Sequence, residues 1–205
     1  DLHIIAPVRE WKMSRDEEIK FAEANGIKTS VSLSKPYSVD KNLWGRSIEC
    51  GVLDIPDREP PNEVFEWTVP PETAPDKPEY LDIEFERGIL KALNGAHLKP
   101  VELVETLNEI AGRHGVGRID HMEDRLVGIK SREIYECPAA LVLLDAHHDL
   151  EKMVLTRHEI QFKRMVDSQW TFLVYAVLWL DPLKDDLEAF INETQTRVSG
   201  NVKLK

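Results

Sequence analysis

The alternation of apolar and polar residues predicts strands in the middle of the chain and at its end. Apolar side chains alternate with acidic ones over residues 81–86, which is the period of a half-buried strand. A return strand is predicted over residues 89–93, and Asn94-Gly95 after it is a hairpin turn signal. Residues 202–205 alternate in the same way. These segments favour hairpin-connected strands over a run of strand–helix–strand units.

Five other segments are predicted to be helices from their caps and their apolar spacing: residues 15–24, 100–112, 139–153, 156–180 and 183–198. Ser14 and Glu17 form a capping box before the first helix. Pro100 and Pro138 suit the first positions of the next two. Apolar residues nearly encircle the second half of 156–180, more than one face of a single domain requires. We therefore expect one long helix there, with at most one break, covered by another subunit.

Together these elements predict the α+β class: a mixed or antiparallel sheet with packed helices and a long C-terminal oligomerisation helix. Residues 2–7 and 27–33 are further predicted strands. Seven of the twelve prolines lie within residues 56–78, which predicts an extended surface excursion. Because the chain opens and closes inside predicted strands, we expect it to be a fragment of a longer protein.

Composition narrows the classes of protein to which the chain can belong. With 205 residues, 42% of them apolar, it can bury a sizeable core. A formal net charge of −11 disfavours a general nucleic-acid-binding surface, which requires a basic patch. Two cysteines without CxxC spacing predict neither a zinc ribbon nor a disulfide framework. No apolar run approaches the roughly 18 residues of a membrane span, and we expect a cytoplasmic protein.

The most distinctive stretch is residues 114–138, HGVGRIDHMEDRLVGIKSREIYECP, in which three glycines separate short apolar steps and many charged groups. Glycine lets the backbone turn sharply or approach a ligand closely. One interpretation is a β-hairpin that turns at residues 122–125, with Glu123 a solvated turn residue and Tyr135 a core tyrosine. The other is a set of tight turns and short strands that holds polar groups over a binding surface.

Two other groups of polar residues are candidates for chemistry. Ser38 suits the N-cap of a short helix, and Ser47 would be a hydroxyl at a helix end. Nine residues at about 100° each would point the two serines to opposite sides of one straight helix, so they converge only if that helix ends between them. His147 and His148 suggest a metal, but adjacent helical residues point about 100° apart. We therefore expect no metal site.

The order of short motifs along the chain resembles that of the argininosuccinate synthetase family. The shared runs are IIAPVREW near the start, NGIKTSVSLSKPYSVDKNLWGRSIECG at 25–51, HGVGRID and GIKSREIYECPA in the central stretch, DAHHDLEKM at 145–153 and TQTRVSGNVKLK at the end. They cover nearly the whole chain in the family's order, although APVREW stands where many members have APWR. By this resemblance, residues 1–33 are the tail of a nucleotide-binding domain. Residues 34–205 are then the synthetase and multimerisation domain, truncated at its C-terminus.

The resemblance implies a ligase of arginine biosynthesis that joins L-citrulline and L-aspartate into argininosuccinate through a citrullyl-adenylate, with release of AMP and pyrophosphate from ATP. It implies that Ser38, Ser47, Glu123 and Tyr135 contact citrulline, and that the enzyme is a homotetramer. The family's ATP loop, Ser-Gly-Gly-Leu-Asp-Thr-Ser, does not occur in this sequence. ATP with its Mg²⁺, and aspartate, are therefore expected to bind mainly outside residues 1–205, which alone would be inactive. Two alternatives stay open: a non-catalytic oligomerisation module derived from the family, and another ATP-pyrophosphatase synthetase with a different acceptor.

Overall fold

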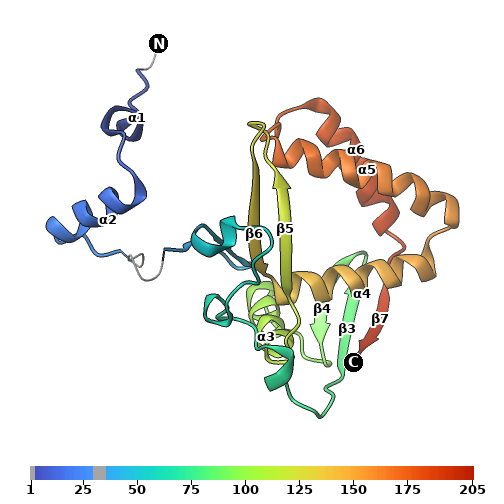
Figure 1. The fold of residues 1–205 in the computed structure, drawn as a ribbon. Coiled ribbons are helices and arrows are strands. Elements are labelled where there is room, and N and C mark those ends of the chain that lie inside the picture. The colour runs from blue at the N-terminus through green and yellow to red at the C-terminus, as the bar shows by residue number, and fades with distance from the viewer. Residues whose placement is uncertain (1–2, 30–35) are drawn as a thin grey trace.

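The computed structural model describes residues 3–29 and 36–205 (Figure 1). Within these ranges the α-helices are α1 (Pro7–Trp11), α2 (Arg15–Ala24), α3 (Pro100–Arg113), α4 (Pro138–Val154), α5 (Arg157–Tyr175) and α6 (Pro182–Gln195). The strands are β1 (Ser38–Lys41), β2 (Arg46–Glu49), β3 (Leu81–Glu86), β4 (Ile89–Leu93), β5 (Arg118–Asp124), β6 (Lys130–Glu136) and β7 (Gly200–Leu204). The 3₁₀ helices η1 (Gly51–Asp54), η2 (Asn62–Val64) and η3 (Pro71–Thr73) lie between β2 and β3. The α+β class is thus confirmed.

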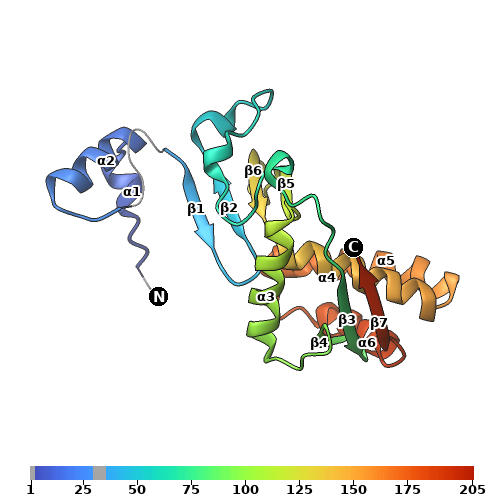
Figure 2. The same cartoon turned by 90° about the horizontal axis from the view of Figure 1, so that it is seen from below.

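The strands form two antiparallel sheets, one in the order β1-β2-β6-β5 and the other in the order β4-β3-β7. Helix α4 packs on α3 and β7, and α3 contacts β4, so these two helices cover the second sheet. Helices α5 and α6 pack against each other, near the tip of the β5–β6 hairpin in Figure 1. Both views place α1 and α2 apart from the two sheets (Figures 1 and 2).

The main core lies between the β4-β3-β7 sheet and helices α3 and α4. Its most completely buried side chains are Ile83, Leu103, Leu107, Ala139, Ala146 and Val198. Every second residue of β3 is buried, which confirms the alternation predicted for residues 81–86. The core therefore unites segments that lie more than a hundred residues apart in the sequence.

The proline-rich segment covers one face of the β1-β2-β6-β5 sheet. Leu53 of η1 and Val64 of η2 form a small buried cluster with Ile48 of β2 and Ile134 of β6. Phe65 packs against the same cluster. Residues 56–78 form no α-helix and no strand, as predicted, although Val64 is buried against the sheet. The segment leaves the opposite face of the sheet to polar side chains.

The segment from Ser38 to Ser47 is a β-hairpin and not the short helix that the N-cap interpretation predicts. Ser38 begins β1, and Ser47 is the second residue of β2. The side-chain oxygen of Asn42 accepts hydrogen bonds from the amides of Trp44 and Gly45, at 2.8 and 3.2 Å. This local bond closes the turn between the strands.

The strands predicted near the start of the chain are not formed by the described residues. Of the segment 2–7, residues 3–6 form no element, and Ile4 and Ile5 are 94% and 78% exposed. Residues 27–29 form no element either, and the rest of segment 27–33 lies outside the described residues. A strand needs a neighbour for its backbone groups, and no described strand pairs with these segments. The predicted domain boundary after residue 33 also lies outside the described residues and stays a prediction.

The helix predicted over residues 156–180 ends five residues early. Helix α5 ends at Tyr175, Val177 has φ +60°, and the amide of Leu178 donates to the carbonyl of Leu173 at 2.9 Å. This is the left-handed helix end that glycine usually provides. A valine at that position gave no sequence signal for it.

The other predicted caps are confirmed. The carboxylate of Glu17 accepts the amide of Ser14 at 2.7 Å at the start of α2. Pro100 and Pro138 are the first residues of α3 and α4. None of the helices in the described part of the chain is long and apolar enough to cross a membrane.

Candidate functional site

The central stretch forms a β-hairpin whose turn lies three residues beyond the predicted one. Strands β5 and β6 stay paired as far as Asp124 opposite Lys130. The turn follows, with the amide of Arg125 donating to the carbonyl of Ile129 at 3.0 Å. Glu123 is therefore a strand residue with a fixed direction, and the prediction of a turn carboxylate is wrong.

The register of this sheet places the four predicted citrulline contacts on one face. Opposed residues of antiparallel strands share a face, as do residues i and i+2 of one strand. Ser47 is opposite both Asp40 and Tyr135, and Ser38 lies two residues from Asp40. Glu123 lies on the same face, because it is opposite Ser131 of β6, which is four positions before Tyr135. A hairpin thus brings the two serines to one side, which a straight helix would not.

Glu123 and Tyr135 meet at the centre of the site. The hydroxyl oxygen of Tyr135 lies 3.3 Å from Glu123 Oε2 and 2.5 Å from Glu133 Oε2. Tyr175, the last residue of α5, donates its hydroxyl to Glu123 Oε1 at 2.5 Å. Glu123, Tyr135 and Tyr175 border a cavity of about 530 Å³ together with His121, whose ring centroid is 6.4 Å from that of Tyr135.

The two serines lie beside this cavity and do not line it. Both are half-buried. Ser47 is adjacent to Tyr135 across the β2–β6 ladder, whereas Ser38 is one strand farther out. The structure therefore brings Glu123, Tyr135 and Ser47 close together and leaves Ser38 at the edge of the same face.

The electrostatics of the site favour a cation. The hydrogen bond from Tyr175 is the main cause that lowers the pKa of Glu123, so this carboxylate is ionised at neutral pH. Burial, followed by the hydrogen bond to Glu133, raises the pKa of Tyr135, which stays a neutral phenol. The bond to Glu123 likewise raises the pKa of Tyr175. The arrangement is a carboxylate surrounded by neutral hydroxyl groups, which suits an ammonium ligand.

A buried ion pair lies on the face of the β1-β2-β6-β5 sheet opposite the candidate site. Glu136 of β6 is fully buried, and its carboxylate accepts hydrogen bonds from Arg46 Nη1 at 2.7 Å and from the amides of Glu66, Trp67 and Thr68 at 2.9–3.0 Å. The hydroxyl of Thr68 adds a bond of 2.7 Å. This network ties the proline-rich segment to β2 and β6, and so fixes the strands that carry the site.

Two glycines permit close backbone contacts around this support. A Cβ on Gly112 would lie 2.1 Å from the carbonyl oxygen of Trp67. A Cβ on Gly117, where φ is +123°, would lie 2.6 Å from the Cα of Pro138. These glycines thus allow two backbone segments of the protein to approach each other closely; the contact is with the chain's own backbone and not with a ligand.

Two residues of the site were missed by sequence reasoning. Glu133 alternates with Tyr135 on β6, so the strand period carried a signal that it points to the same side. Tyr175 reaches Glu123 from 52 residues away. No local pattern could have indicated that contact.

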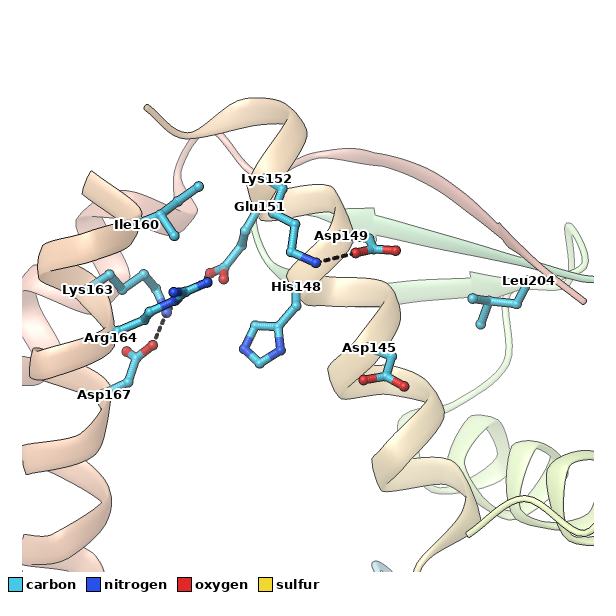
Figure 3. Close-up of a pocket in the computed structure, with 10 residues that line it drawn as sticks. All are labelled: Asp145, His148, Asp149, Glu151, Lys152, Ile160, Lys163, Arg164, Asp167 and Leu204. Atoms are coloured by element: carbon cyan, nitrogen blue, oxygen red, sulfur yellow. Dashed lines mark hydrogen bonds and ion pairs between the residues drawn. The ribbon is translucent and has the colours of Figure 1, made fainter. Parts of the chain in front are cut away.

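A second cavity, of about 510 Å³, lies between α4 and α5 (Figure 3). The ammonium group of Lys163 is 3.2 Å from Glu151 Oε1 and 2.7 Å from Asp167 Oδ2. His148 points into the gap from α4 (Figure 3). Acidic and basic groups largely neutralise each other there. Within the described ranges, no three His, Cys, Asp or Glu residues are grouped so that they could hold a metal ion.

Comparison with known proteins identifies the family. Residues 37–205 match the family model described as the arginosuccinate synthase C-terminal domain. Argininosuccinate synthase of Pyrococcus furiosus is 57% identical over the whole chain, which covers 49% of that relative. The argininosuccinate synthases of Rubrobacter xylanophilus and Methanococcus maripaludis are 55% and 54% identical, again over the whole chain and over 50% and 52% of each relative. The chain thus spans about half the length of the relatives it matches, and it belongs to the argininosuccinate synthase family.

Proposed function

We propose that this chain is the citrulline-binding and oligomerisation part of an argininosuccinate synthase. The observation that carries the proposal is the shared face of Ser38, Ser47, Glu123 and Tyr135 in the β1-β2-β6-β5 sheet. These residues come from four different strands, and each is a citrulline contact that the family resemblance implies.

The chemistry of the face matches that of citrulline. Citrulline carries an ammonium group, a carboxylate and a neutral ureido group. The ionised carboxylate of Glu123 suits the ammonium group, and the hydroxyls of Ser38 and Ser47 can donate to the carboxylate or to the ureido oxygen. Tyr135 lies between Glu123 and Ser47 on the same face. The face can therefore orient one molecule of citrulline by complementary polar groups.

The proposed reaction is ATP-dependent ligation of L-citrulline and L-aspartate to argininosuccinate. The ureido oxygen attacks the α-phosphate of ATP, which gives citrullyl-adenylate and pyrophosphate, and the aspartate amine then displaces AMP. Residues 1–205 would contribute by positioning citrulline and by electrostatic stabilisation, since the reaction requires no protein nucleophile. ATP, with Mg²⁺ as its counter-ion, and aspartate would be held mainly by residues beyond this chain. The setting proposed for this reaction is the cytoplasm.

Assembly into a homo-oligomer, proposed to be a tetramer, is supported by an apolar surface at the end of α5. The side chains concerned are 44–93% exposed: Phe172, Tyr175, Val177, Leu178, Trp179 and Leu180. Burial of such surface stabilises association by about 25 cal/mol per Å² before the costs of association are subtracted. The same surface favours the alternative of a non-catalytic association module. Activity of the gene product separates the two.

The test is an assay of pyrophosphate release by the gene product that contains these residues, with ATP and aspartate, and with L-citrulline or L-glutamine as the acceptor. We expect release that depends on citrulline, and light scattering that shows an oligomer at micromolar concentration. Purified residues 1–205 alone should release none. Acceptance of glutamine in place of citrulline would favour another ATP-pyrophosphatase synthetase. A gene product that is folded and oligomeric but releases no pyrophosphate would favour the association module.

A further inference from the structure

Glu133 is a glutamate of the site for which the family resemblance assigns no role. It lies on β6 between Ser131 and Tyr135, on the face that carries Glu123. Only 8% of its surface is exposed. Among the described residues no cation pairs with it: its hydrogen bonds come from Tyr135 at 2.5 Å and from Ser131 at 3.3 Å, and its carboxyl group also interacts with that of Glu123. A buried carboxylate satisfied only by hydroxyl groups is costly without a further reason for its presence.

Glu133 determines where the hydroxyl proton of Tyr135 points. A tyrosine hydroxyl has one proton to donate. The shorter contact assigns the Tyr135 proton to Glu133 Oε2 at 2.5 Å, and the proton of Tyr175 is directed to Glu123 Oε1. Glu123 Oε2 then faces the hydroxyl oxygen of Tyr135 at 3.3 Å with no proton between them. Two hydrogen-bond acceptors, the oxygen of Tyr135 and Glu123 Oε2, therefore lie next to each other without a donor.

We propose that Glu133 is a positioning residue for the ammonium group of the amino-acid ligand, and this inference rests on the proposed function. By holding the phenolic proton, Glu133 turns the oxygen of Tyr135 into an acceptor. An ammonium group that bridges the two acceptors from the cavity side donates one proton to Glu123 Oε2 and another to the oxygen of Tyr135. The bound cation thereby relieves the repulsion present in the free site. Glu133 acts through Tyr135 and does not touch the ligand itself.

The test is Glu133→Gln in the gene product, alone and combined with Tyr135→Phe, followed by steady-state kinetics in citrulline at saturating ATP and aspartate. A neutral amide pulls less on the phenolic proton, so Tyr135 donates to Glu123 and competes with the ligand. We expect KM for citrulline to rise about 5- to 10-fold with kcat nearly unchanged, which is the difference between hydrogen bonds to charged and to neutral acceptors. KM for ATP and for aspartate should change much less.

The double variant distinguishes positioning from direct contact. If Glu133 acts only through Tyr135, adding Glu133→Gln to Tyr135→Phe should raise KM no further. Glu84→Gln, at a half-buried glutamate of β3 in the other sheet, is the matched control and should leave KM unchanged. Melting temperatures of all variants show whether any loss is one of folding.

Each outcome has a defined meaning. An unchanged KM in Glu133→Gln, or effects of the two substitutions that multiply, would overturn the positioning role while the proposed function stands. A KM that rises only in step with a falling melting temperature would make Glu133 a structural residue. A wild-type protein with no citrulline-dependent activity would overturn both.

Discussion

Two glutamates of the same sheet, Glu136 and Glu123, show how the two faces differ. Glu136 is fully buried and bound to Arg46, three backbone amides and one hydroxyl. Glu123 has no cationic partner within hydrogen-bond distance among the described residues: it contacts the hydroxyls of Tyr135 and Tyr175, interacts with the carboxyl group of Glu133, and borders a cavity. A carboxylate whose charge is already balanced by a guanidinium, and whose oxygens already accept hydrogen bonds within the protein, cannot pair with a cationic ligand. A carboxylate without a cationic partner can still pair with a cationic ligand. Glu136 is therefore structural, and Glu123 is the candidate for binding.

The largest effect is expected where the structural carboxylate loses its charge. Glu136→Gln leaves the buried guanidinium of Arg46 with only the exposed Glu66 as a carboxylate partner, and it places amide protons against backbone donors. Breaking a buried ion pair costs about 3–5 kcal/mol, so the free energy of unfolding should fall by that amount in denaturant titration. Glu66→Gln is the matched control, because Glu66 contacts the same arginine at 3.0 Å with a side chain that is 61% exposed.

The control should lower the free energy of unfolding by no more than about 1 kcal/mol, as for exposed ion pairs. Equal effects of the two substitutions would contradict the contrast between the faces, since burial would then not decide the strength of the contact.

A smaller loss of stability is expected from Gly112→Ala. The new Cβ would push away the carbonyl of Trp67, whose neighbouring amides donate to Glu136. Overpacking of this kind costs about 1–3 kcal/mol. Hydrogen exchange of amides 66–68 should accelerate. The exposed Glu109 on the same helix gives the control Glu109→Ala, and faster exchange of these amides there as well would argue against a local effect.

The smallest effect concerns the contact that lowers the pKa of Glu123. Tyr175→Phe removes the main cause of that shift, so the pKa of Glu123 should rise toward its ordinary value of 4.5. Because the pKa is lowered in the folded chain, the ionised form contributes stability above 4.5 and loses it as pH falls through the lowered value. Carboxyl ¹³C NMR titration measures the change. A titration curve identical to that of the wild type would show that Tyr175 does not hold Glu123.

Strong local signals predicted much of the fold. The alternation in β3, the prolines that begin α3 and α4, and the capping box at Ser14 each depend on residues within one turn or one strand, so sequence was sufficient. The predicted helix between Ser38 and Ser47 failed because four-residue strands are too short to show a period. The turn signal was the side chain of Asn42, which binds two nearby amides.

For the candidate site, the family resemblance named residues but not their arrangement. The resemblance supplied Ser38, Ser47, Glu123 and Tyr135, and the register then placed them on one face. Tyr175 depends on where α5 ends, and that end is set by a valine with positive φ. Such tertiary contacts have no pattern along the chain.

The most direct test of the binding face is calorimetric titration of L-citrulline into the gene product and its Glu123→Gln variant. The variant removes the charge and keeps the shape. Because hydrogen bonds to charged groups contribute about 1.5–3 kcal/mol, citrulline should bind roughly 10- to 150-fold more weakly. The free energy of unfolding without ligand should fall by no more than about 1 kcal/mol, because the variant weakens the hydrogen bond from Tyr175 but keeps an acceptor for it. Glu86→Gln, at an exposed glutamate of the other sheet, should change neither quantity. Unchanged citrulline affinity in Glu123→Gln, with a lower melting temperature, would show that Glu123 is structural and that citrulline binds elsewhere.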